Sequence, residues 1–270
     1  MTETTRILAE YIRDTRYEDI TSEVIEKSKS LILDCLGCGF GGLNDRASRI
    51  IVDYVKEFGG KPQASVLGAS FKSDVGHAAL ANGVIFHALD FDDYHDETVV
   101  HATASCLPAL LALAEYRKFT GREILTALVV GIDISVRLSL GLGSYHYELG
   151  WHTTSTAGRF GATAAVAKLL NLDTDKIVNA FGICGTQAAG VRQVFGTMSK
   201  PFNAGKASMD GLMSALLAER GFTSSKEIIE GKLGILDVMT RKPHKEKIVK
   251  ELGFKNYLLD ICIKPYPSCA

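Results

Sequence analysis

The chain has 270 residues, of which 30 are basic and 31 acidic, so its formal charge is −1, and 46% of its residues are hydrophobic. This length is enough for one large domain or two small ones with a substantial core. The balanced charge excludes a strong field toward nucleic acid or an anionic membrane, so an anionic ligand would have to be met by a few placed cations.

The N-terminal stretch MTETTRILAEYIRD mixes acidic and basic residues and predicts neither a secretory signal nor a transit peptide. The longest apolar run, from about Ile124 to Ile132, is broken by a glycine and an aspartate and is shorter than the roughly 18 residues of a membrane span. We therefore expect a cytoplasmic protein that does not enter the membrane.

Helical spacing of apolar residues predicts a short helix over 5–13 and a longer one that begins at Ser22 and ends in the glycines from residue 37. This second helix contains Cys35 and Cys38, which have CxxC spacing. Because no second pair matches them, we expect buried thiols and neither a zinc nor a redox site. A third helix ends at Gly59 and Gly60.

A short extended piece at 64–68 precedes Asp74, which can cap a helix to about residue 88. The acidic stretch DFDDYHDETVVH follows, from Asp90 to His101, between two apolar segments. Buried carboxylates are costly unless paired or protonated, so we expect this loop outside the core, at the lip of a buried region. The alternative is a solvated connection between two helices. The members expected to support the loop's shape or remain in solvent are Asp92, Asp93, His95 and Asp96.

The mostly apolar segments 107–116 and 123–140 predict buried central helices. Asp133 and Arg137 are four residues apart in the second and should form an ion pair. Small residues at 150–173 would let another backbone approach closely. Further helices are predicted from Asp173 or Thr174 and through 212–217 to Gly221. The best strand candidate is YLLDICI at 257–263.

These elements predict a mainly all-α fold. A large helical domain would span residues 1–245, and residues 246–270 would begin a smaller α+β domain. An isolated strand is not stable, so the strand candidate implies further sheet from elsewhere.

Two polar residues outside the acidic loop stand in small-residue or glycine-rich surroundings. His152 is followed by four hydroxyl residues, and Lys200 lies in TMSKPFNAG, just ahead of a predicted helix start at Asn203 to Gly205. A helix N-terminus beside a lysine suits a carboxylate or phosphate. Taken singly, His152 could be an ordinary side chain at a helix N-terminus, and Lys200 could be a solvated cation in a loop. With Asp90, Asp92, Asp93 and His101, they form an acid, base and cation set that lacks a nucleophile signature such as GxSxG.

The same stretch could hold a metal, because carboxylates and imidazoles bind several divalent ions. Its spacing is neither that of an EF-hand nor HExxH, so we expect no metal. No GxGxxG follows a predicted strand and no GxxxxGK[ST] is present, so no nucleotide cofactor is predicted.

As a set, these motifs resemble the MmgE/PrpD family, which includes 2-methylcitrate dehydratase, cis-aconitate decarboxylase and iminodisuccinate epimerase. The resemblance runs in order from LILDCLGCGFGG to the end of the chain. It rests on ALANGVIFHALDFDD, HATASCLPALLALAE, GWHTTSTAGRFGATAAVAKLLNLD, SKPFNAGKASMDGLMSALLAERGFT and KPYPSC. It implies a large all-helical domain, a smaller α+β domain near the C-terminus, a homodimer, and no metal or organic cofactor.

The resemblance also implies roles for residues of this chain. The implied catalytic residues are Asp90, His101, His152 and Lys200, and the implied substrate-binding residues are Tyr94, Thr153 and Asn203. These roles agree with the chemistry. Proton transfer beside a carboxylate needs an imidazole of near-neutral pKa, and a lysine can hold the substrate carboxylate.

The leading hypothesis is a cofactor-independent hydro-lyase of the 2-methylcitrate dehydratase type that acts on a small di- or tricarboxylate. Decarboxylation of a cis-aconitate-like acid and epimerisation of an imino-diacid stay open, because Tyr94, Ala102 and Asn203 depart from residues common in the family. A hypothesis of another class is an inactive helical dimerisation subunit or half of a split enzyme. A separate chain would then supply the C-terminal part, since family chains continue well beyond KPYPSC.

Overall fold

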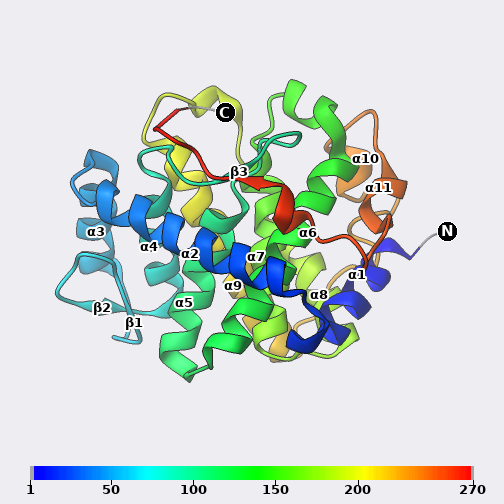
Figure 1. Ribbon diagram of the computed structural model, residues 1–270, viewed down its shortest axis with the longest axis horizontal. Helices are drawn as coiled ribbons and strands as arrows, with labels where there is room; N and C mark the ends of the chain where they lie inside the picture. Colours follow the sequence, from blue (N-terminus) through cyan, green and yellow to red (C-terminus); the bar gives the residue numbers. More distant parts are fainter. Residues whose placement is uncertain (1–2, 269–270) are drawn as a thin grey trace.

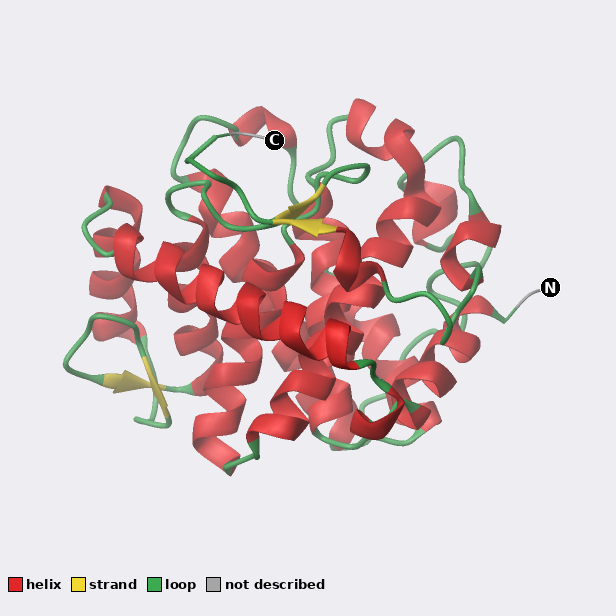
Figure 2. Ribbon diagram, in the orientation of Figure 1, coloured by secondary structure: helices red, strands yellow, loops and turns green. Residues whose placement is uncertain are grey.

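The computed structural model describes residues 3–268 and is mainly helical, with four short strands in that range (Figure 2). The predicted helical periodicities form long helices: α1 (Thr4–Asp14), α2 (Ser22–Gly42), α3 (Arg46–Phe58), α4 (Val75–His87), α5 (Ala102–Arg117), α6 (Gly121–Glu148), α7 (Thr153–Leu169), α8 (Thr174–Gly185) and α9 (Ser199–Glu219). Short elements complete the fold: α10 (Ile235–Val238), α11 (Lys245–Val249), η1 (Tyr17–Asp19), η2 (Arg192–Val194), η3 (Tyr257–Asp260), β1 (Ala64–Ser65), β2 (Lys72–Ser73), β3 (Tyr94–His95) and β4 (Ile261–Cys262). The mainly all-α prediction is confirmed.

The core lies where α5, α6 and α7 pack together, with α4 and α9 against them. α2 runs across the front of this assembly (Figure 1). Side chains on several faces of α5 and α6 are fully buried, as their continuous apolar sequence predicts. α4 and α9 approach most closely at Gly83 and Gly205, where a Cβ on Gly83 would lie 2.6 Å from the Cα of Gly205. Glycine at both positions is therefore a packing requirement.

Several local predictions hold. Asp74 accepts hydrogen bonds from the backbone N–H groups of Gly76 and His77 at the start of α4, and Asp173 caps α8. At α2, the cap is Thr21, which accepts from Val24, while the predicted cap Ser22 is the first helical residue.

The ion pair in α6 also holds. Asp133 and Arg137 are both fully buried, with Nε of Arg137 2.6 Å from Oδ2 of Asp133. The CxxC cysteines, Cys35 and Cys38, lie buried on α2 as free thiols. The length and composition of α6 would allow it to cross a membrane, but 89% of its most apolar window is buried in this fold, as expected of a core helix.

α9 begins earlier than predicted. Its first residue is Ser199, so Lys200 lies in the first turn of the helix and not in a loop ahead of Asn203. The helix accommodates Pro201 because the first-turn N–H groups have no intrahelical partner. The helix then continues without a break to Glu219, and the predicted stop at Gly221 has the left-handed φ of +89°.

The predicted strand at 257–263 is largely wrong. Residues Tyr257–Asp260 form η3, and only Ile261–Cys262 is extended. The N–H of Tyr257 donates to Oδ1 of Asp133, and the N–H of Leu258 donates to the Asn256 side chain, so neither N–H is available to a sheet. The remaining strand, β4, pairs antiparallel with β3 in the acidic loop, with Tyr94 opposite Cys262. This pairing places the C-terminal segment over the acidic loop (Figure 1).

Candidate active site

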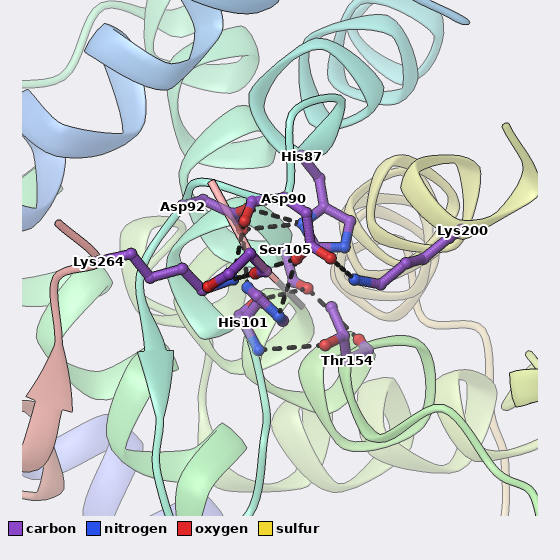
Figure 3. A network of polar contacts seen from close by, with 9 residues as sticks. His87, Asp90, Asp92, His101, Ser105, Thr154, Lys200 and Lys264 are labelled. Carbon is purple, nitrogen blue, oxygen red and sulfur yellow. Dashed lines mark hydrogen bonds and ion pairs between the residues drawn. The ribbon is translucent and has the colours of Figure 1, made fainter. Parts of the chain in front are cut away.

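The predicted site residues meet where three helices begin. His101 is the N-cap residue of α5, His152 is the N-cap residue of α7, and Lys200 lies in the first turn of α9. The acidic loop from the end of α4 supplies Asp90 to the same place (Figure 3). Helix N-termini carry partial positive charge, so their convergence favours an anion.

Asp90 is the centre of the charged contacts. Its carboxylate accepts a hydrogen bond from Lys200 and lies 3.1 Å from Nζ of Lys264, with Nε2 of His101 3.7 Å away. The backbone of Asp90 has a left-handed φ of +51°. Burial raises the pKa of the Asp90 carboxyl, but the positive potential of His87 and the hydrogen bond from Lys200 outweigh it, so the pKa lies below its ordinary value.

Lys264 was not singled out from the sequence. It comes from the KPYPSC motif that follows β4, and it is 5% exposed. Its ammonium group donates to the backbone oxygens of Asp90 and Ser268, at 2.8 and 2.6 Å, as well as to the Asp90 carboxylate. The long-range pairing of β3 with β4 brings it into the site from 174 residues away. Two lysine ammonium groups therefore flank one carboxylate.

Asp92 does not remain in solvent, which was one of the two positions expected for it. It is fully buried, and each of its oxygens lies 2.8–2.9 Å from Nδ1 of His87. Nδ1 of His101 is 3.1 Å from its Oδ2. Burial opposes ionisation of Asp92, but His87 and His101 hold its pKa well below the ordinary value. Asp93 is also fully buried, and burial raises its pKa well above that of an ordinary carboxyl, which favours the neutral form.

Asp92 and Asp93 are buried, and both agree with the rule that a buried carboxylate is costly unless it is paired or protonated. Asp92 is paired with histidine, and burial favours the neutral form of Asp93. The sequence shows neither feature, because the partner of Asp92 lies on a different element and the raised pKa of Asp93 depends on its surroundings. Of the other two, His95 is also buried, and its Nδ1 lies 3.0 Å from Oγ1 of Thr98, while Asp96 is exposed.

The His101 imidazole is 2% exposed and is fixed from the backbone side. The backbone N–H of His101 donates to Oγ1 of Thr154, and the backbone carbonyl of His101 accepts from the Ser105 hydroxyl. Burial lowers the pKa of His101 more than Asp92 raises it, so the ring is neutral near pH 7. The negative charge of Asp92, 3.1 Å from Nδ1, favours the proton on that nitrogen although the two atoms are not aligned as a hydrogen bond, and this leaves a lone pair on Nε2, on the side of Asp90.

The His152 ring is held by Asn203, whose amide donates to Nδ1 at 3.0 Å, and by an edge-on contact with Phe195. An accepting Nδ1 requires the proton of the neutral ring to sit on Nε2. Burial, followed by repulsion from His87 and His101, lowers the pKa of His152 well below its ordinary value. His101 and His152 thus carry their protons on opposite nitrogens, so one offers a lone pair at Nε2 and the other an N–H.

The predicted substrate-binding residues differ in position. Asn203 lies in the site against His152. The Tyr94 ring lies 6.3 Å from the His101 ring and beneath the Lys264 ammonium group, while its hydroxyl is directed to Asp96. Thr153 lines a pocket of about 240 Å³ whose other lining residues include Glu97, Ser144 and Lys247. The hydroxyl that contacts His101 comes instead from the next residue, Thr154.

Four side chains in the site could offer ligand atoms to a metal ion. These atoms lie within 4.8 Å of one another and belong to His87, Asp90, Asp92 and His101. The donor set suits several divalent ions. A cation there would have to compete with the ammonium groups of Lys200 and Lys264, which already neutralise Asp90. The donor chemistry around Asp90 therefore fits an anion better than a metal.

Comparison with known proteins was made over the whole chain. Residues 6–247 match the MmgE/PrpD N-terminal domain. Cis-aconitate decarboxylase of Aspergillus terreus is 32% identical over 266 residues, which covers 93% of this chain and 54% of that protein. The human cis-aconitate decarboxylase is 30% identical over 274 residues, with coverage of 98% and 56%. The mitochondrial 2-methylcitrate dehydratase of Yarrowia lipolytica is 24% identical over 272 residues, with coverage of 92% and 51%.

The chain thus spans about half the length of the curated relatives it matches. The family model, by contrast, accounts for most of the chain. The chain belongs to the MmgE/PrpD family.

Proposed function

We propose that this chain carries catalytic groups of a lyase that acts on a small di- or tricarboxylate by histidine acid/base chemistry. The observation that carries the proposal is the setting of Asp90, which lies between Lys200 and Lys264 and beside His101. A substrate carboxylate can take over these lysine contacts. The three helix N-termini add partial positive charge on the same side.

The two histidines suit proton transfer at carbon. Neutral His101 has a lone pair on Nε2 and can take a proton, whereas His152 has an N–H to donate. In a decarboxylation, the bond between carbon and one carboxylate breaks, CO2 leaves, and the electron pair stays on carbon until a donor protonates it. In a dehydration, a base removes a proton from carbon, an acid such as the His152 N–H protonates the neighbouring hydroxyl, and the hydroxyl leaves as water while the C=C bond forms. The lysines stabilise the negative charge that develops in either case.

The relatives favour one of these reactions. Over the aligned residues, the cis-aconitate decarboxylases are 30–32% identical to this chain, whereas the 2-methylcitrate dehydratase of Yarrowia lipolytica is 24% identical. We therefore place decarboxylation of a cis-aconitate-like acid ahead of the dehydration favoured by the sequence motifs, with imino-diacid epimerisation third. A homodimer stays a prediction.

A substrate panel tests the proposal. The chain, alone and with any partner chain that co-purifies with it, is assayed with cis-aconitate, 2-methylcitrate, citrate and iminodisuccinate, in the presence and absence of a chelator. We expect CO2 release from cis-aconitate, unaffected by the chelator, and a loss of at least about a hundredfold in His101→Gln. Release of no product from any of the four acids would refute the proposed activity of this chain.

A matched lysine pair tests the site. Lys200→Met should lower kcat/KM by about tenfold or more, because a charged hydrogen bond to the substrate is lost. Lys206 lies on the same helix and pairs with Asp210 at a more exposed position, so Lys206→Met is the control. Equal kinetics in the two variants would show that the anion binds elsewhere.

A further inference from the structure

His87 lies at the end of α4 and was not among the residues singled out from the sequence. It is 1% exposed, and its Nδ1 is 2.8 and 2.9 Å from the two oxygens of Asp92. Its ring packs edge-on against His101, with 4.5 Å between centroids, and lies 6.3 Å from the His152 ring. His87 therefore touches the carboxylate that His101 also faces (Figure 3).

The two histidines do not share Asp92 equally. His87 approaches both oxygens, whereas Nδ1 of His101 lies 3.1 Å from one oxygen but outside hydrogen-bond alignment with any described residue. Hydrogen bonds weaken steeply as they lose linearity. The orientation of the Asp92 carboxylate is thus set by His87.

The opposite nitrogen of His87 has no hydrogen-bond partner within residues 3–268, although it is buried. Buried polar atoms are seldom left unpaired unless they have a functional reason. The hydrogen bonds of the His87 ring are confined to Asp92, so His87 can act on the geometry of the site through that carboxylate, in addition to the direct charge effect it has on neighbouring groups.

We propose that His87 is a positioning residue that holds the Asp92 carboxylate out of alignment with His101 and so keeps the His101 imidazole available as a neutral proton acceptor. The role of His87 in catalysis rests on the proposed function. Its effect on the pKa of His101 does not, because that pKa is a property of the free protein. A carboxylate aligned with Nδ1 would bind the imidazolium form more tightly and raise the pKa of His101.

The surroundings of His101 support this direction. Asp92 raises the pKa of His101, and both burial and His87 lower it. The charged or titratable groups that face the two rings come from the acidic loop, the N-terminus of α7, α9 and the C-terminal segment; they are Asp90, Asp92, Tyr94, His152, Lys200 and Lys264. Of the carboxylates, Asp92 lies nearest to His101, so its orientation affects the pKa of His101 most.

Proton NMR titration of the imidazole C–H resonances measures the pKa of His101 without any substrate. The chain has seven histidines, and the signal that His101→Gln removes identifies the one in question. In His87→Ala we expect Asp92 to turn to His101 and the protonation constant of His101 to rise about tenfold, or one pKa unit. In His87→Asn the amide nitrogen takes the place of Nδ1 and can still donate to Asp92, so the rise should be smaller than in His87→Ala and limited to the lost repulsion from His87.

His87→Gln is the matched geometric control, since its amide nitrogen takes the place of the other ring nitrogen and cannot reach Asp92 in the same way. It should behave like His87→Ala. His77→Ala removes a histidine that pairs with Asp74 on the same helix, at its far end, and should leave His101 unchanged. Thermal denaturation of each variant identifies any that does not fold, and the comparison of Asn with Gln holds even if the alanine variant is lost.

Turnover adds a second readout where a substrate has been found. Activity lost in His87→Ala and His87→Gln below about pH 6.5 should return as the pH rises past the new pKa of His101, with KM little changed. A merely structural role for His87 would give no such recovery. An unchanged His101 pKa in His87→Ala, or equal shifts in the Asn and Gln variants, would overturn the inference whether or not the chain turns over any of the four acids.

Discussion

Replacement of Arg137 by methionine should weaken the fold strongly, because this arginine fastens the C-terminal segment to the core. Its side chain is fully buried in α6, and Nε donates to Asp133 at 2.6 Å. The two terminal nitrogens donate to four backbone carbonyls in α11 and in the segment from α11 to η3, at 3.3, 2.8, 3.4 and 2.6 Å; these belong to Ile248, Lys250, Glu251 and Lys255. The other oxygen of Asp133 accepts the N–H of Tyr257.

The magnitude follows from the loss of one partner of a buried pair. Arg137→Met leaves the Asp133 carboxylate buried without its counterion and leaves four carbonyls without their donor. Such a change costs about 3–5 kcal/mol of unfolding free energy. For a chain of this size that corresponds to a fall in Tm of roughly 6–20 °C. The double variant Asp133→Leu/Arg137→Met should recover part of the loss, because no unpaired charge then stays buried.

Urea denaturation measures the free energy, and hydrogen exchange localises the effect. We expect faster exchange over residues 245–262 than over α5 and α7. Arg117→Met is the control, because Arg117 makes a comparable bidentate contact with Glu219 in a partly exposed position, where it contributes about 1 kcal/mol or less. If Arg137→Met lost no more unfolding free energy than Arg117→Met, Arg137 would not hold the C-terminal segment to the core.

Three further changes test individual parts of the structure. Asp93→Asn should stabilise the protein more at pH 8 than at pH 5. Because the pKa of Asp93 is raised in the native state, wild-type stability falls as pH rises between the unfolded and folded pKa values, by up to about 1.4 kcal/mol per pH unit. Denaturation at several pH values measures this difference. Gly205→Ala should lower the Tm by several degrees, since the added Cβ would come within 2.9 Å of the Val84 backbone nitrogen; no change would mean that α4 and α9 lie farther apart. Asn203→Asp places a carboxylate against Nδ1 of His152 and should raise the pKa of that ring, as NMR titration would show.

The helices could be predicted from the sequence because their periodicity and caps are local. The buried α5 and α6, the cap at Asp74 and the pair of Asp133 with Arg137 all follow from spacing within one element. The early start of α9 was missed, although the first turn of a helix tolerates Pro201.

The candidate site was predictable to the extent that its residues lie in motifs. Asp90, His101 and Lys200 are brought together as expected, although their catalytic roles stay predictions. His87 and Lys264 were not identified, because one is a single histidine in an apolar helix and the other arrives through the pairing of β3 with β4. Long-range pairing of two-residue strands leaves no periodic signal in either segment.

The proposed function requires that the lysines around Asp90 bind a small tricarboxylate. The most direct measurement is the calorimetric affinity of the chain for cis-aconitate at neutral pH, in the wild type and in Lys200→Met, with Lys206→Met as the control. We predict saturable binding in the wild type and in the control, and binding weaker by about tenfold or more in Lys200→Met. Equal affinity in all three proteins, or no binding to the wild type, would contradict the claim.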